Sequence, residues 1–343
     1  MNRIAKADSF TRGAGFEQAA ARLNLQAAIV EKDFWVCWML WLLFAPDGWP
    51  DSLVFKGGTS LSKVFGVLRR FSEDIDLSVA PQALGIDENI VNQADSRNKG
   101  ERWMKEMEGK CCAWVEQHLY PSLESKVEDI LGKRPAEKGK WLEYERDVAM
   151  HSPVLYFNYP CEFPEGDSYI RRQVKLEFGS LTDQHPTGRH RVSPWLVEVL
   201  SDEMQEMGCE VVALEMERAF WEKVTILHAE YHRDADSPMP ERYSRHYADV
   251  AAMAARTEAL AAVENDSLRN QVVEWKALFF ARSWARYDLA KPGTFRLIPP
   301  DNRLPELLRD YQSMRDMFLD QPPSFDKVLE ILRNLESRIN RTP

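Results

Sequence analysis

The sequence predicts an α+β fold in which a few short strands are followed by a long helical half. Two patterns predict this fold. In the first half of the chain, apolar residues alternate with polar ones over short stretches, which is typical of strands. From Leu214 onward they recur at helical spacing, with one break at residues 291–300. We expect a helix at residues 25–44 and strands at residues 53–55, 74–79, 154–159 and 173–178.

The chain has 343 residues, enough for two domains or for one domain with a large insertion. Hydrophobic residues make up 44% of it, including eleven tryptophans, which indicates a globular protein with a substantial core. We place the domains at residues 1–205 and 206–343, because strand patterns give way to helical ones near residues 199–208. Residues from about 87 to 146 are charge-rich with helical spacing, so we interpret them as a helical insertion.

The sequence indicates a cytoplasmic protein without a membrane partner. The longest apolar stretch, residues 34–45, is too short to span a bilayer and follows the charged residues Glu31-Lys32-Asp33, so we expect a buried helix there. The N-terminal residues lack the apolar core of a signal peptide. The five cysteines are scattered without metal-binding spacing, which fits free thiols in a reducing cytosol.

The net charge of −10 argues against indiscriminate binding to nucleic acid, but it leaves room for a local basic site. Residues 276–296 hold five Lys or Arg against one Asp, interleaved with aromatic residues. This stretch has two interpretations that the sequence does not separate. Its aromatic and basic side chains could guide a single nucleic-acid strand, or they could pack helices and leave a solvated basic face.

Residues 53–79 hold the most informative pattern: a strand, a glycine pair, a helix and a second strand. Gly57 and Gly58 directly follow the first strand. The expected helix after them has one apolar face, made of Leu61, Val64, Phe65 and Leu68. Thr59 or Ser60 could cap that helix.

The second strand carries two carboxylates on one face. Asp74 and Asp76 lie two residues apart, so their side chains point the same way. They repel each other and need a cation or a basic partner. Glu177, on the strand at residues 173–178, can join them if the two strands are neighbours. Oxygen ligands without Cys or His favour Mg²⁺ or Mn²⁺.

The glycine pair fits the same chemistry. A Gly-Gly turn at the start of a helix lets backbone N–H groups approach a phosphate, with Thr59, Ser60 and Lys63 as further donors. Each pattern alone has an ordinary interpretation, since a glycine pair is often a simple turn and a D-x-D strand is often a solvated face. Their order along the chain favours a site for a metal-bound nucleoside triphosphate (NTP).

A lysine in the C-terminal half stands out as well. Lys223 falls in the middle of the apolar face of a helix expected at residues 215–231. A lysine there either pairs with an acid of the core or faces a cleft, where it would meet an anion. Downstream, Arg245 and Asp249 are spaced i, i+4, which is also typical of an ordinary helix ion pair.

Four stretches together resemble the AbiEii/AbiGii nucleotidyltransferase toxins, including the MenT toxins, of bacterial abortive-infection and toxin–antitoxin systems. They are VEKDFW, FKGGTSLSKVFGVLRRFSEDIDL, VKLEFG, and ERAFWEKVTILHAEYHR followed by RYSRHYADV. The resemblance implies a DNA-polymerase-β-like nucleotidyltransferase domain with a small mixed sheet, joined to a helical C-terminal lobe.

The resemblance also implies roles for single residues. Asp74 would be the main metal ligand and Asp76 the second, with Lys223 and Asp249 as further catalytic residues. His246 stands where the family motif often has its first Asp, and Asp249 is the carboxylate that remains. The nucleotide-binding set would be Gly57, Gly58, Thr59, Ser60, Lys63, Ser72 and Arg245.

The function implied is transfer of a nucleoside monophosphate from an NTP to RNA, with a tRNA 3′ end as acceptor, in phage defence or toxin–antitoxin control. Mg²⁺ or Mn²⁺ would be the cofactor, and an antitoxin encoded nearby would be a partner. Two alternatives stay open. The acceptor could be a protein or small-molecule hydroxyl, or the chain could be a weakly active nucleotide-binding partner of an antitoxin.

Overall fold

The computed structural model describes residues 1–72, 74–87, 97–147, 152–163, 171–199 and 207–341. The chain divides into two compact units. The first comprises Met1–Val64, Phe71–Val91 and Lys105–Ala213, and the second Phe65–Arg70, Asn92–Met104 and Leu214–Pro343. Most of the expected boundary at residues 199–208 lies outside the described residues. Strands gather in the first unit and helices dominate the second, so the α+β class is confirmed.

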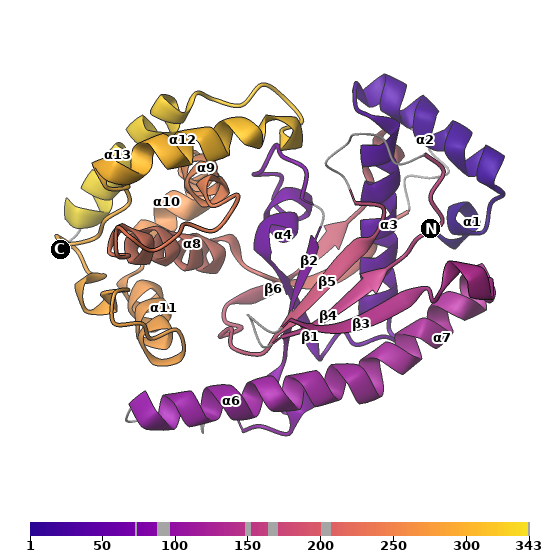
Figure 1. Cartoon of the computed structure of the whole chain (residues 1–343), viewed down its shortest axis with the longest axis horizontal. Helices are drawn as coiled ribbons and strands as arrows, with labels where there is room; N and C mark the ends of the chain where they lie inside the picture. The colour runs from indigo at the N-terminus through magenta and orange to yellow at the C-terminus, as the bar shows by residue number, and fades with distance from the viewer. Residues whose placement is uncertain (73, 88–96, 148–151, 164–170, 200–206, 342–343) are drawn as a thin grey trace. The chain divides into compact units, whose positions relative to one another are not determined.

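The first unit is built on a seven-stranded mixed sheet with the order β3-β4-β5-β2-β1-β7-β6 (Figure 1). The strands are β1 (Leu53–Lys56), β2 (Asp74–Val79), β3 (Leu142–Asp147), β4 (Ser152–Phe157), β5 (Val174–Gly179), β6 (Thr187–Val192) and β7 (Cys209–Leu214). β2 pairs antiparallel with β1 and parallel with β5, and β1 pairs parallel with β7. The four expected strands are therefore present, while β3, β6 and β7 were not predicted.

The helices of the first unit begin with α1 (Asn2–Ala5), α2 (Ser9–Leu23), α3 (Ala27–Phe44) and α4 (Gly57–Lys63). α3 is the expected apolar helix and is buried along nearly its whole length. Its Trp38 ring stacks on Phe157 of β4 at a centroid distance of 5.5 Å, and Trp35 meets the same ring edge-on. Such aromatic pairs join α3 to the sheet and bury large apolar area.

The expected insertion is helical for most of its described length. α6 (Arg97–Trp114) leads through a π-helical turn (Val115–Leu119) into α7 (Tyr120–Leu131). Residues 142–146, which we expected to be helical as well, form β3, where every residue from Leu142 to Asp147 pairs with β4. Cross-strand pairing outweighs the local helical preference of this charged segment.

The predicted helix after the glycine pair is too long. α4 ends at Lys63, and Phe65 and Leu68 lie beyond it. Gly66, beyond the C-cap Val64, has a φ of +60°, a left-handed conformation that a continuing helix does not adopt, and residues 66–69 have no regular secondary structure. Leu68 is buried in this irregular segment, so its apolar character reflects the core and not a helix face.

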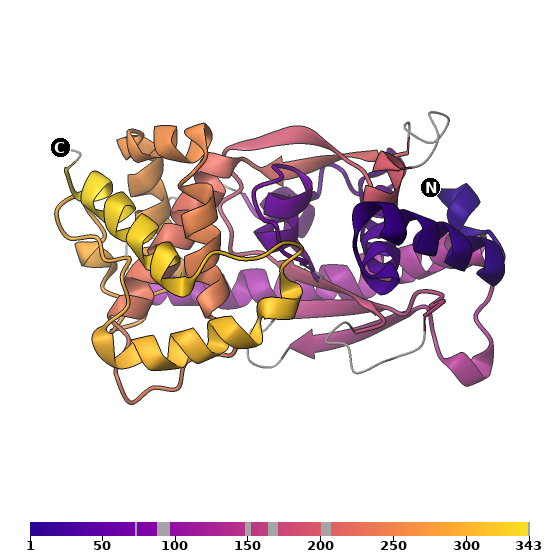
Figure 2. The same cartoon turned by 90° about the horizontal axis from the view of Figure 1, so that it is seen from above.

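The second unit is mainly helical. Its helices are α8 (Met216–Tyr231), α9 (Ser244–Met253), α10 (Thr257–Val263), α11 (Asp266–Phe279), α12 (Leu304–Ser313) and α13 (Phe325–Arg341). α8 packs against α9, α10 and α11, and α9 also packs against α12 and α13 (Figures 1 and 2).

Short 3₁₀ helices occur at Pro81–Leu84, Ala136–Lys138, Trp195–Glu198, Tyr287–Leu289, Asp301–Arg303 and Arg315–Met317. Across the described ranges, no helix has both the length and the apolarity that crossing a membrane requires.

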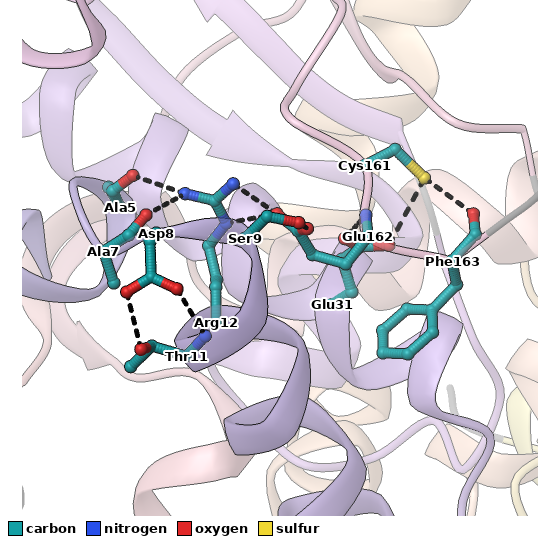
Figure 3. A network of polar contacts seen from close by, with 10 residues as sticks. All are labelled: Ala5, Ala7, Asp8, Ser9, Thr11, Arg12, Glu31, Cys161, Glu162 and Phe163. Atoms are coloured by element: carbon teal, nitrogen blue, oxygen red, sulfur yellow. Dashed lines mark hydrogen bonds and ion pairs between the residues drawn. The ribbon is translucent and has the colours of Figure 1, made fainter.

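A polar network joins α2 and α3 to the segment after β4 (Figure 3). Arg12 of α2 donates to the carbonyls of Ala5 and Ala7 and pairs with Glu162, which follows β4. Glu31 of α3 accepts the backbone N–H of Glu162 at 2.7 Å. Burial raises the pKa of the Glu31 carboxyl to about 7, although that hydrogen bond opposes the shift.

Candidate active site

The glycine turn and the D-x-D strand form one local structure. Lys56 of β1 stands opposite Asp76 of β2, so the next residue, Gly57, meets the Asp76 side chain. Gly57 has a φ of +79°, and a Cβ on it would lie 1.9 Å from Asp76 Oδ2. Only glycine fits this position, because any side chain would collide with the carboxylate. Gly58 is the next residue of α4.

The side chains of Asp74, Asp76 and Glu177 lie on the same face of the sheet. β2 and β5 are parallel neighbours, which meets the condition set for Glu177, and their register sets Asp76 beside Glu177 and Asp74 beside Lys175. Glu177 pairs with Lys175. Asp74 and Asp76 are both half-buried. Among the described residues, no three or more His, Cys, Asp or Glu side chains are placed so that they could hold a metal together. The link between Asp76 and Glu177 is therefore their pairing in the strand register.

Thr59 ties the start of α4 to the beginning of β2. Its hydroxyl donates to the carbonyl oxygen of Asp74 and lies 2.8 Å from the hydroxyl of Ser72. Thr59 is buried, as is Ser60 beside it. The Thr59 hydroxyl therefore fixes the distance between the glycine turn and the carboxylate strand.

Lys63 also makes its contacts inside the first unit. Its Nζ is 2.6 Å from Asp33 Oδ1, with both side chains buried, and lies 4.5 Å from the centre of the Trp195 ring. Asp33 Oδ2 accepts the backbone N–H of Trp195 at 2.7 Å. Burial works against the charged ammonium, but the attraction of Asp33 outweighs it and raises the pKa of Lys63.

In the second unit, the carboxylate of Asp249 on α9 pairs with two cationic side chains. Lys223 of α8 donates to Asp249 Oδ2 at 2.9 Å. Arg70 donates to Oδ1 through Nε at 2.8 Å and to Oδ2 through Nη2 at 2.9 Å. Burial alone would raise the pKa of Asp249, but Arg70 and Lys223 hold it far below its usual range. Lys223 thus does pair with an acid of the core.

Arg245 and His246 lie beside this group. Arg245 is half-buried, and its side chain has no hydrogen bond or ion pair with any residue that the structure describes, so it does not form the i, i+4 pair with Asp249. Burial and the nearby charges of Lys223 and Arg245 lower the pKa of His246 well below its usual value. His246 is therefore neutral at pH 7, and Asp249 is ionised.

The predicted site residues thus form two groups. One lies at β1, α4, β2 and β5 of the first unit, and the other at α8 and α9 of the second. Sequence reasoning missed Asp33 and Arg70. For Asp33 a signal existed, because a charged run, Glu31-Lys32-Asp33, interrupts a helix that is otherwise apolar and buried. For Arg70 the only signal was its place two residues before Ser72.

Part of the basic and aromatic stretch at residues 276–296 packs inside the second unit. Phe279 and Phe295 are buried. Lys276 pairs with Glu222 at 2.5 Å and Arg286 with Asp288 at 2.9 Å. Burial favours the packing interpretation for Lys276, Phe279 and Phe295. The other basic residues of the stretch are exposed, and both interpretations stay open for them: Arg282, Arg286, Lys291 and Arg296.

An α+β fold with strand carboxylates beside a glycine turn is compatible with a nucleotidyltransferase, and the family match shows that this chain is one. It belongs to the family described as the nucleotidyl transferase AbiEii toxin of a Type IV toxin–antitoxin system, whose model matches residues 41–331. A search of curated proteins finds no match. Among solved structures, the chain is similar to MenT4, a nucleotidyltransferase toxin from Mycobacterium tuberculosis H37Rv. The two share 16% identity, the match covers 100% of this chain and 90% of that chain, and the TM-score is 0.48.

Proposed function

We propose that this protein transfers a nucleoside monophosphate from an NTP to RNA, with a tRNA 3′ end as the acceptor, and so blocks translation. The observation that carries the proposal is the contact between Gly57 and Asp76, because it joins a phosphate-binding type of turn to a metal-binding type of strand. Membership of the toxin family supports the same reaction class.

Asp74 and Asp76 are the proposed metal ligands. Both side chains are half-buried on one strand face, and a donor set of carboxylate oxygens suits Mg²⁺ or Mn²⁺. When bound, such an ion screens charge on the phosphates and favours attack by the acceptor hydroxyl. Glu177 is a further candidate ligand, since it stands beside Asp76 in the register.

The remaining residues have two kinds of proposed role. Lys223 and Arg245 neutralise phosphate charge, and the backbone of Gly57 and Gly58 offers N–H donors to the triphosphate. Thr59, Ser72 and Lys63 have supporting roles, because their polar atoms already make contacts within the first unit. Thr59 and Ser72 hold α4 to β2, and Lys63 holds α4 to α3.

We further propose that the protein acts in the cytoplasm, where NTPs and tRNA are found, and that a cognate antitoxin restrains it in phage defence or toxin–antitoxin control. Family membership supports the antitoxin. Two other functions remain to be separated from this one: transfer to a protein or small-molecule hydroxyl, and nucleotide binding with little turnover.

The test incubates the purified protein with each α-labelled NTP, Mg²⁺ and total tRNA. Label in tRNA that is removed by 3′ exonuclease supports the proposal. Label in a protein or in a small molecule would mean that this molecule, and not tRNA, is the acceptor. NTP binding without any labelling would support the alternative of a weakly active nucleotide-binding partner of an antitoxin. The Asp74→Asn variant should lose labelling by about 100-fold or more, whereas Asp51→Asn, which removes an exposed carboxylate, should keep it.

A further inference from the structure

Arg70 is the member of the Asp249 group that no sequence pattern singled out. Its side chain is 4% exposed and that of Asp249 is 1% exposed, whereas the side chain of Lys223 is 11% exposed. Arg70 contacts both oxygens of the carboxylate, and Lys223 contacts only Oδ2. Of these three residues, Lys223 is therefore the one most open to a ligand.

The backbone around Arg70 is anchored as well. Arg70 forms an antiparallel β-bridge with Phe318, and the carbonyl of Arg69 accepts the N–H of Leu319 at 3.0 Å. A guanidinium held at its base and forked onto both oxygens allows the carboxylate of Asp249 a single orientation. Asp249 in turn determines where the ammonium of Lys223 lies.

Lys223 keeps hydrogen-bonding capacity in this arrangement. An ammonium has three N–H donors, and among the described residues only Asp249 accepts one from Lys223. The charge of Asp249 is divided between Arg70 and Lys223, so it does not neutralise Lys223 alone. The largest charge effects on Lys223 come from Asp249, Arg70 and Arg245, and Lys223 in turn acts on the imidazole of His246.

We propose that Arg70 is a positioning residue for nucleotidyl transfer, an inference that rests on the phosphate-binding role proposed above for Lys223. Arg70 fixes Asp249, and Asp249 presents the ammonium of Lys223 to the triphosphate with two donors available. Arg70 itself does not touch the nucleotide in this scheme. Its removal leaves Lys223 fully engaged by Asp249 and less able to bind phosphate.

The experiment compares Arg70→Met, Arg70→Lys and a matched control, Arg69→Met. Arg69 is the neighbouring arginine, and its side chain is 70% exposed and paired with Asp320. For each variant, kcat and KM for RNA labelling are measured across pH, and binding of each NTP with Mg²⁺ is measured by calorimetry. Near-UV circular dichroism and thermal melting report whether the variant is folded.

Arg70→Met should weaken NTP binding by about tenfold or more and lower kcat/KM by about 100-fold. It should also move the alkaline limb of kcat/KM to higher pH. Arg70 repels the Lys223 ammonium and lowers the pKa of Lys223, so losing Arg70 raises that pKa. Arg70→Lys keeps the charge and the alkaline limb, but it should lose about tenfold in kcat because a single ammonium cannot hold both oxygens. Arg69→Met should stay within about twofold of the wild type.

A folded Arg70→Met protein whose alkaline limb does not move would make Arg70 merely structural and overturn the proposal. Arg70→Lys with wild-type kcat would overturn it too, since the fork would be dispensable. If Arg70→Met does not fold, Arg70→Lys decides the question by the same criterion. Failure of the RNA proposal is a separate result: the wild type would bind NTP without labelling tRNA, and Arg70 would then be judged from NTP binding across pH.

Discussion

Gly57 and Asp76 are in such close contact that a single Cβ atom on Gly57 would lie 1.9 Å from Asp76 Oδ2. The two residues come from adjacent antiparallel strands, and the register of β1 and β2 brings them together. This contact explains why position 57, the first residue of α4, is a glycine. The turn is shaped around the carboxylate.

The first prediction follows from that contact. Gly57→Ala should abolish labelling, because the added Cβ must displace the Asp76 carboxylate. Gly85→Ala is the matched control, because Gly85 also has a positive φ, of +64°, yet a Cβ there would meet nothing within 4 Å. Both variants carry a backbone cost of about 1–2 kcal/mol, which denaturant unfolding measures. Equal loss of activity in the two variants would mean that the contact with Asp76 is irrelevant to the reaction.

The second prediction separates Lys223 from Asp249. In Lys223→Met, Asp249 keeps the fork of Arg70, so the free energy of unfolding should change by no more than about 2 kcal/mol. In Asp249→Asn two buried cations lose their counter-ion, and the loss should be about 3–5 kcal/mol. Wild-type protein should melt at a higher temperature with NTP and Mg²⁺, and Lys223→Met should not. A Lys223→Met protein that still labels tRNA would remove Lys223 from the reaction.

The third prediction concerns Lys63 and its buried partner. Lys63→Met leaves Asp33 with the Trp195 N–H as its remaining contact in the described structure and should destabilise the protein by about 3–5 kcal/mol. The double variant Lys63→Met/Asp33→Leu should recover much of that loss, because no buried charge is left unpaired. Urea unfolding of the single and double variants gives the coupling energy. A stable Lys63→Met protein that fails to bind NTP would instead place Lys63 at the triphosphate.

The fourth prediction is a pH dependence that Glu31 causes. Its pKa is raised from 4.5 to about 7, so the folded state holds a proton that the unfolded state releases. The stability from this group is complete below pH 4.5 and is lost as pH rises through 7, by about 3 kcal/mol at most. Glu31→Gln mimics the protonated form, so its stability should not fall over that range.

The control for this measurement is Glu17→Gln, which alters an exposed glutamate of α2. Unfolding in urea at a series of pH values should give the wild-type slope for Glu17→Gln and a flatter one for Glu31→Gln. Identical slopes in the wild type and Glu31→Gln would show that Glu31 is ionised in the folded protein at neutral pH.

The sequence by itself determined the local features. Strand alternation placed Asp74 and Asp76 on one face, the run of apolar residues predicted α3, and helical spacing exposed Lys223 as a misplaced charge. These features depend on residues close together in the chain, whose relative geometry follows from the backbone dihedral angles of the few residues between them. For the same reason the α+β class and the order of the main elements could be predicted.

The tertiary structure decided which residues meet. Arg70 and Asp249 are 179 positions apart, and Lys63 and Asp33 are 30 apart, so no periodicity links them. The helix is predicted to continue through Leu68 because an apolar residue has the same sequence signature in a helix face and in a buried irregular segment, whereas α4 ends at Lys63. The partner of such a buried charge is decided by packing, because a charge that packing removes from water is costly unless an opposite charge lies beside it.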